Sequence, residues 1–204
     1  MATTLQKFTC MGCDAPCCRE IVREVEGITL GLLLTRRERM RIERLATMRG
    51  HSIDIRPMIG FGYDEDIGEP EFIGFYQITN NPCPFLAGSK CEIHGQRPLI
   101  CRAYPLVMRD FYITGEGRRA NVHVVISFDL RCKWVEGIRK SVKLTRLRDS
   151  DIVKLGIKRE AEAMKSVVDL FVKYMRRYRY RVWYFDLSKD KWVEIEVMEV
   201  RERG

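Results

Sequence analysis

The stretch CMGCDAPCC, residues 10–18, places four cysteines within nine consecutive positions. Thiols this close in the chain can converge on a metal without closing a large loop. The chain has eight cysteines, and the last 72 residues contain none. The other four lie in segments rich in Pro, Gly and turn residues, at Cys83, Cys91, Cys101 and Cys132. Because thiolate is a soft ligand, this set predicts a fold organised around zinc, iron or an iron-sulfur cluster.

The spacing inside this stretch bears on the number of sites. Cys10 and Cys13 form a CxxC pair, the usual unit for two ligands of one metal. Cys17 and Cys18 are adjacent, and adjacent side chains of an extended backbone point to opposite faces. Both can serve one mononuclear site only where the chain turns sharply, so we expect a polynuclear cluster or two neighbouring sites. The downstream cysteines match no zinc-finger spacing, and for each of them a small buried hydrophobic role is the alternative.

A disulfide framework is the rival interpretation of an even cysteine count, and it requires an oxidising compartment. The first ten residues, MATTLQKFTC, lack the apolar core of a secretory signal, and the longest apolar run, residues 28–34, is too short to span a bilayer. These features predict a cytoplasmic protein without membrane attachment, in which thiols stay reduced. A very hot source would weaken this argument, because disulfides persist inside some hyperthermophiles.

Composition divides the chain of 204 residues into two parts of different character. With 46% apolar and 31% charged residues the chain is globular, and its net charge is +8. From residue 133 onward there are 19 Lys and Arg against 12 Asp and Glu, so nearly all the excess lies outside the cysteine region. We therefore expect a Cys-rich zinc- or iron-chelating domain over residues 1–132. A basic helix plus hairpin, residues 133–204, is expected to pack on it.

Periodicity and turn residues predict an α+β fold: short strands and loops in the Cys-rich region, then a long helix and a C-terminal β-hairpin. A buried strand is expected over residues 27–34, and a helix capped by Thr35 over residues 36–50. Residues 51–70 are expected to be loop with one strand at most. The remaining expected elements are a strand over 71–79, a short helix over 98–102, a hairpin of 106–114 with 120–128, a long helix over 149–180 and a closing hairpin of 181–187 with 192–200.

Three motifs together resemble a known family. They are the CxxCxxxCC stretch of residues 10–18, CPFL at residues 83–86 and CEIHGQRPLICRAYP at residues 91–105, followed by Cys132. In this order they closely resemble the YkgJ-type cysteine-cluster family over roughly residues 8–132. Its members are described as zinc- or iron-chelating proteins and often as iron-sulfur-cluster proteins. The chain departs from the family pattern at one point. Three residues, Asp14, Ala15 and Pro16, separate Cys13 from the adjacent pair Cys17 and Cys18, whereas the family usually has two.

The resemblance implies that all eight cysteines bind the metal, and it points to three supporting residues. His94 lies in the Ile-His motif and is expected to hydrogen-bond a sulfur rather than to ligate, because eight thiols already fill two tetrahedral sites. Arg97 and Arg102 fall on motif positions, where guanidinium groups would offset thiolate charge. Ordinary surface ion pairing is the alternative for both.

Three function classes follow. The first is a metal-binding protein that holds zinc or iron through clustered thiolates. The second is an iron-sulfur-dependent oxidoreductase, or an enzyme related to the methyltransferases, because flagellin lysine N-methylases carry a related cysteine region. The third is a nucleic-acid-binding protein that uses two basic segments, residues 139–148 and 173–181, the latter with three tyrosines among five basic residues. The solvated face of a helix is the alternative for these segments.

Overall fold

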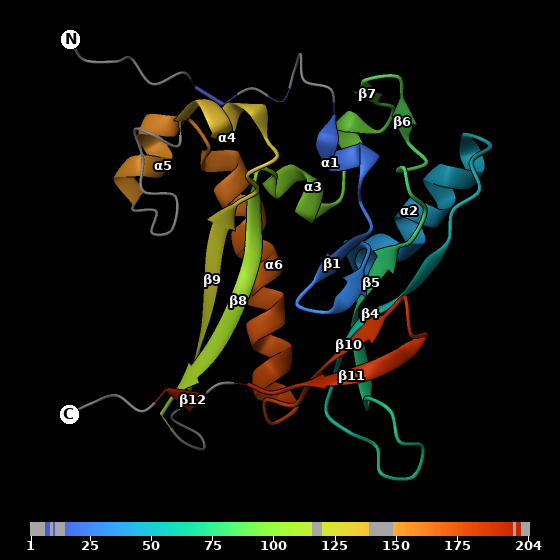
Figure 1. The fold of residues 1–204 in the computed structure, drawn as a ribbon, viewed down its shortest axis with the longest axis vertical. Coiled ribbons are helices and arrows are strands. Elements are labelled where there is room, and N and C mark those ends of the chain that lie inside the picture. Colours follow the sequence, from blue (N-terminus) through green and yellow to red (C-terminus); the bar gives the residue numbers. More distant parts are fainter. Residues whose placement is uncertain are drawn as a thin grey trace.

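The computed structural model describes residues 7–8, 10, 15–115, 120–138, 149–197 and 199–200. Within them, two main β-sheets lie on either side of one long helix, α6 (Lys158–Arg177) (Figure 1). Helices and strands are thus both present in quantity, which confirms the α+β class.

The larger sheet has five strands in the order β11-β10-β4-β5-β3, and all neighbours are antiparallel. Its strands are β3 (Leu32–Thr35), β4 (Ile55–Phe61), β5 (Phe72–Ile78), β10 (Val182–Asp186) and β11 (Lys191–Ile195). The closing hairpin expected from the sequence is formed by β10 and β11. It does not stand alone, because Val182 of β10 pairs with Phe61 of β4. The C-terminal part therefore extends a sheet that begins in the Cys-rich part.

The second sheet is the expected hairpin plus one short strand. It contains β8 (Leu106–Thr114), β9 (Asn121–Phe128) and β12 (Glu199–Val200), with β12 parallel to β8. Two small antiparallel pairs complete the strands: β1 (Arg23–Val25) with β2 (Ile28–Leu30), and β6 (Leu86–Ala87) with β7 (Lys90–Cys91).

The shorter helices surround this frame. They are α1 (Pro16–Arg19), α2 (Arg36–Met48), the 3₁₀ turn η1 (His94–Gln96), α3 (Leu99–Ala103), α4 (Lys133–Ile138) and α5 (Asp149–Leu155). Helix α2 begins as predicted, because the Thr35 side chain accepts a hydrogen bond from the Glu38 amide while the Glu38 carboxylate accepts one from the Thr35 amide.

The prediction of one continuous helix over residues 149–180 is wrong. The helix is interrupted at Gly156, whose φ of 68° lies in the left-handed region. The Gly156 amide donates to the Val153 carbonyl and the Ile157 amide to the Ile152 carbonyl, each at 3.2 Å. This is the hydrogen-bond pattern that ends a helix at a glycine. The chain then restarts as α6 in a new direction.

The predicted single strand over residues 27–34 is likewise split, into β2 and β3, at Gly31. The Gly31 amide donates to the Gln77 side-chain oxygen at 2.6 Å, and a Cβ on Gly31 would lie 2.2 Å from the Ile78 carbonyl oxygen. The fully buried Gln77 side chain also donates to the carbonyls of Pro57 (2.7 Å) and Phe185 (3.2 Å). One side chain thus links the junction of β2 and β3, strand β4 and the C-terminal strand β10.

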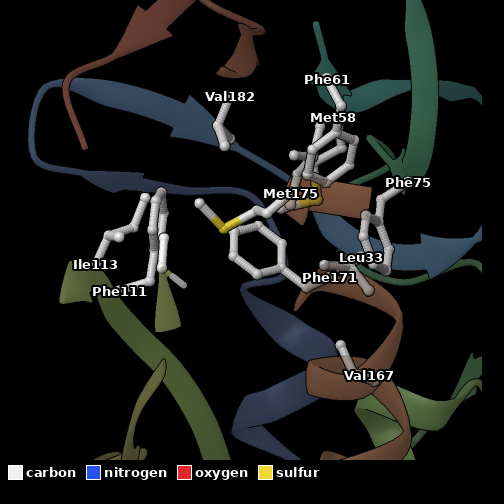
Figure 2. Packing of buried hydrophobic residues seen from close by; sticks show 12 residues of the cluster. Leu33, Met58, Phe61, Phe75, Phe111, Ile113, Val167, Phe171, Met175 and Val182 are labelled. Carbon is white, nitrogen blue, oxygen red and sulfur yellow. The ribbon is translucent and has the colours of Figure 1, made fainter. Parts of the chain in front are cut away.

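The main hydrophobic core lies where α6 meets both sheets. Phe171, fully buried on α6, packs against Phe61 of β4 at a ring-centroid distance of 5.7 Å and against Phe111 of β8 at 4.9 Å (Figure 2). Val167 and Met175, on the adjacent turns of α6, pack into the same cluster. Helix α6 therefore holds the two sheets together.

Candidate metal centre

Six of the predicted cysteine ligands line one cavity of about 480 Å³. They come from the N-terminal segment, α1, the loop after β5, β7 and α3, and they are Cys10, Cys17, Cys18, Cys83, Cys91 and Cys101. Helices α1 and α3 and the β6–β7 pair lie together at one end of the molecule, opposite β12 (Figure 1). Residues as far apart as 10 and 101 in the sequence thus supply thiols to one space.

A sharp turn brings the adjacent pair Cys17 and Cys18 to the same cavity. Ala15 has a left-handed backbone (φ 52°, ψ 49°), and Pro16 then starts the single helical turn of α1. The two Sγ atoms lie 3.9 Å apart. The Cys18 carbonyl accepts a 2.8 Å hydrogen bond from the Cys83 amide, which fixes α1 against the loop after β5. The chain therefore makes the turn that a shared site for both thiols requires.

Mutual proximity and burial keep these thiols protonated in the absence of a metal. A hydrogen bond with Cys18 and desolvation raise the pKa of Cys17 far above its usual range. The hydrogen bond with Cys17 lowers the pKa of Cys18, but the hydrogen bond with Cys83, burial, and the charges of Cys83 and Cys91 outweigh it and raise the value to about 12. Desolvation, and then the neighbouring Cys18 and Cys17, raise the pKa of Cys101 as well. A bound cation would favour the ionised form of these thiols, because it would offset the mutual repulsion of their thiolates.

The position of Cys101 is set by a buried carboxylate. Glu38 accepts a 2.6 Å hydrogen bond from the Leu99 amide, the first residue of α3, in addition to its bonds with the Thr35 amide (3.0 Å) and hydroxyl (2.9 Å). One carboxylate thus accepts hydrogen bonds from amide groups at the start of both α2 and α3, which have no partner within their own helix. Since α3 has only five residues, this contact fixes the turn on which Cys101 lies.

Two predicted ligands are not part of the described cavity wall. Cys132 does not line the cavity and is buried in an apolar cluster with Phe128, Val135 and Leu155. Cys13 lies outside the described residues, as does the basic segment 139–148. The roles of both cysteines stay predictions. No disulfide joins any two of the seven cysteines that the structure describes.

The donor set fits a thiophilic metal, although the thiols are not drawn together around one point. Within the described ranges, no group of three or more Cys, His, Asp or Glu side chains is close enough to hold an ion. The six cysteines instead surround the cavity, so binding would require them to move inward. Soft sulfur donors gathered in this number match zinc, iron or an iron-sulfur cluster and do not match magnesium or calcium.

The predicted supporting residues occupy different places. Arg97 lines the cavity and donates from Nη1 to the Cys10 sulfur at 3.5 Å and from Nε to the His94 carbonyl at 2.9 Å. His94 is exposed at the cavity rim, and the charge of Arg97, together with desolvation, lowers the pKa of its imidazole. Arg102 is exposed on α3 and does not line the cavity. Of the three predicted supporting residues, Arg97 is therefore the one that lies where it can offset thiolate charge.

The cavity wall also includes polar side chains that the sequence analysis did not identify. Asp129, buried, accepts hydrogen bonds from Arg131 Nε (3.0 Å) and Nη2 (2.6 Å) and from Arg23 Nη1 (3.3 Å). Tyr104 lines the wall beside them. Asp129 and Arg131 immediately precede Cys132 in the sequence, which is a local signal, whereas Arg23 lies 106 residues from Asp129 and has none.

Tyrosine rings of the basic segment 173–181 pack against the body of the protein. Tyr178 stacks on Phe72 with centroids 5.2 Å apart, and Tyr174 lies 5.0 Å from the same ring. The basic side chains of the segment, including Arg176 and Arg177, are exposed. This arrangement resembles the solvated helix face more than a stacking platform for bases, and nucleic-acid binding stays a prediction. None of the helices that the structure describes is long and apolar enough to cross a bilayer.

Comparison with known proteins agrees with the geometry of the cavity. Neither the curated proteins nor the solved structures contain a match to the chain. The sequence model of one family, however, matches residues 9–133, the segment that carries every cysteine. That family is described as "Putative zinc- or iron-chelating domain" and is named for its CxxCxxCC motif. The chain therefore belongs to the CxxCxxCC family.

Proposed function

We propose that the protein binds zinc or iron through thiolates of this cavity, either as single ions or as an iron-sulfur cluster. The observation that carries the proposal is the convergence of six cysteines from five separate segments on one cavity. A free cysteine is commonly buried as a small hydrophobic residue, but six such residues around one open space are not explained by packing.

The proposed ligands are the six cavity cysteines together with Cys13, which belongs to the same stretch as Cys10. Arg97 would offset part of the thiolate charge, since it already contacts the Cys10 sulfur. Zinc would make the site structural, whereas an iron-sulfur cluster would supply electron transfer. Cys132 is also in the predicted ligand set, but it lies in an apolar cluster. Its substitution therefore distinguishes a site in the cavity from a site elsewhere.

Anaerobic purification followed by elemental analysis, sulfide analysis and a visible spectrum tests the proposal. Iron with acid-labile sulfide would identify a cluster, and zinc without colour would identify a structural site. A chain that holds neither metal would contradict the proposal.

Two cysteine variants and a matched control locate the site. Cys18→Ala and Cys101→Ala should lower the metal content per chain and the melting temperature, because the free energy of metal binding is also free energy of folding. Cys132→Ala removes a buried sulfur that does not line the cavity and should keep the metal. Loss of metal in the Cys132 variant alone would place the site elsewhere.

An iron-sulfur-dependent oxidoreductase is the second candidate. The observation that favours it is the space in the cavity, which is larger than a closed structural site needs. A reversible change of the visible spectrum on reduction with dithionite would support this candidate, and a zinc-only protein would exclude it.

A further inference from the structure

The cavity has room for an organic molecule in addition to a metal. Its volume of about 480 Å³ lies within the roughly 300–1,000 Å³ of ordinary ligand pockets. Much of its wall away from the thiols is apolar, and this wall includes Leu32, Ile78, Phe85, Ile93, Ile100 and Leu106. A tetrahedral zinc site is closed by its own ligands and leaves no such space. The unused part of the cavity is therefore suited to a ligand with an apolar body.

The charges on the wall favour an anion. Four cationic side chains, Arg23, Lys90, Arg97 and Arg131, line the cavity against the single carboxylate of Asp129, a surplus of three positive charges. This positive lining favours a negatively charged ligand in the part of the cavity away from the thiols.

The spare hydrogen-bond donors are concentrated near Asp129. Arg131 uses Nε and Nη2 on the Asp129 carboxylate and Nη1 on the Glu20 carbonyl at 3.1 Å, so each of its three side-chain nitrogens donates a hydrogen bond. Arg23 is different, because among the described residues its guanidinium donates one hydrogen bond, from Nη1 to Asp129, and a guanidinium has five N–H groups. The edge of Arg23 that does not face Asp129 can form the two-pronged contact that guanidinium makes with carboxylate.

Tyr104 adds a second donor to this region. Its hydroxyl is buried, yet it has no hydrogen-bond partner among the residues that the structure describes. Buried tyrosine hydroxyls normally have a partner, and an exception calls for a missing group. Tyr104 and Arg23 line the same cavity, so one carboxylate could satisfy both.

We propose that the cavity binds a small organic monocarboxylate beside the metal, with its carboxylate held by Arg23 and Tyr104 and its apolar body against the wall formed by Leu32, Ile78 and Phe85. The inference rests on the proposed metal site, because the metal and the carboxylate would share one cavity. A carboxylate with an apolar body is favoured over phosphate because much of the cavity wall is apolar.

Binding of benzoate to the full-length, metal-loaded protein tests the inference. Benzoate is titrated by calorimetry and by thermal shift, with benzamide as its neutral counterpart and inorganic phosphate as the alternative anion. We expect benzoate to bind and to raise the melting temperature, and we expect benzamide and phosphate to bind at least about tenfold more weakly.

Arg23→Gln and Tyr104→Phe should each weaken benzoate binding about tenfold or more, because each removes a donor to a charged group. Arg109→Gln and Tyr112→Phe are the matched controls. Arg109 is exposed, and Tyr112 stacks on His123, with both residues on β8 and outside the cavity. Thermal melts identify a variant that does not fold, and the Tyr104 variant removes only one oxygen, so it tests the proposal if Arg23→Gln fails to fold.

The possible failures are distinguishable. A preparation that contains no metal contradicts the proposed function and this inference together. A metal-loaded protein that does not bind benzoate contradicts this inference alone. Benzoate binding that is unchanged in both variants would place the anion on the metal itself, and tighter binding of phosphate than of benzoate would overturn the carboxylate assignment.

Discussion

Replacement of Glu38 by Ala should destabilise the protein strongly, because one carboxylate holds the first turns of two helices. The change removes the capping box of α2, worth about 1 kcal/mol. It also removes the short bond from the Leu99 amide, a hydrogen bond to a charged group of about 2 kcal/mol. The sum is roughly 3 kcal/mol, which for a chain of this length lowers the melting temperature by about 6–12 °C.

Urea denaturation monitored by circular dichroism measures this loss, and Glu43→Ala on the same helix is the control. Glu43 pairs with Arg39 on the surface at 2.9 Å, an exposed pair that contributes little. Because α3 carries Cys101, the Glu38 variant should also bind metal more weakly than the Glu43 variant. A free energy of unfolding within about 0.5 kcal/mol of wild type would refute the reasoning that Glu38 fixes both helices.

Three further predictions concern the frame that supports the cavity. Phe171→Ala removes a fully buried ring that packs between α6 and both sheets. It should lower the free energy of unfolding, measured by urea denaturation, by about 3–5 kcal/mol. A loss below about 1 kcal/mol would argue against the described core. Gly31→Ala should destabilise the protein by about 2 kcal/mol, because the new Cβ would lie 2.2 Å from the Ile78 carbonyl oxygen. Gly137→Ala is the control and should be neutral or stabilising, because open space surrounds this position in α4. Equal melting temperatures for the two variants would contradict the close approach of Gly31 to Ile78. The hydrogen bonds from Lys189 and Ser188 hold the pKa of Asp186 well below its usual range, so its stabilising contribution is present above about pH 4 and is lost as the pH falls further. The difference in unfolding free energy between wild type and Asp186→Asn should therefore shrink between about pH 5 and pH 2, and a constant difference would disprove the link.

The parts of the fold that the sequence could predict depend on local patterns. The helix capped by Thr35 and the hairpin of β8 and β9 follow from a capping residue and from alternating apolar residues, which act over a few positions. The break at Gly156 also had a local signal, a glycine within an otherwise helical pattern, that the prediction of one long helix overlooked.

The rest depends on which distant segments meet. The pairing of β10 with β4 and the contact of Arg23 with Asp129 join residues more than 100 positions apart, and no local pattern specifies such partners. For the site, the order of the cysteine motifs was enough to indicate the family and to name the six thiols that the structure brings to one cavity. The boundary expected at residue 132 rested on cysteine content and charge, and it stays a prediction.

The central position of β10 and α6 has a consequence for the order in which the protein can be made. A ribosome that has extended the chain through Cys132 has already produced all eight thiols, but it has not produced the helix that joins the sheets or the strand that pairs with β4. The nascent chain must therefore carry its thiols for dozens of residues before the frame around them can close. We expect a stalled chain that ends before α6 to bind zinc or iron more weakly than the finished protein, which would make metal loading a step that follows synthesis.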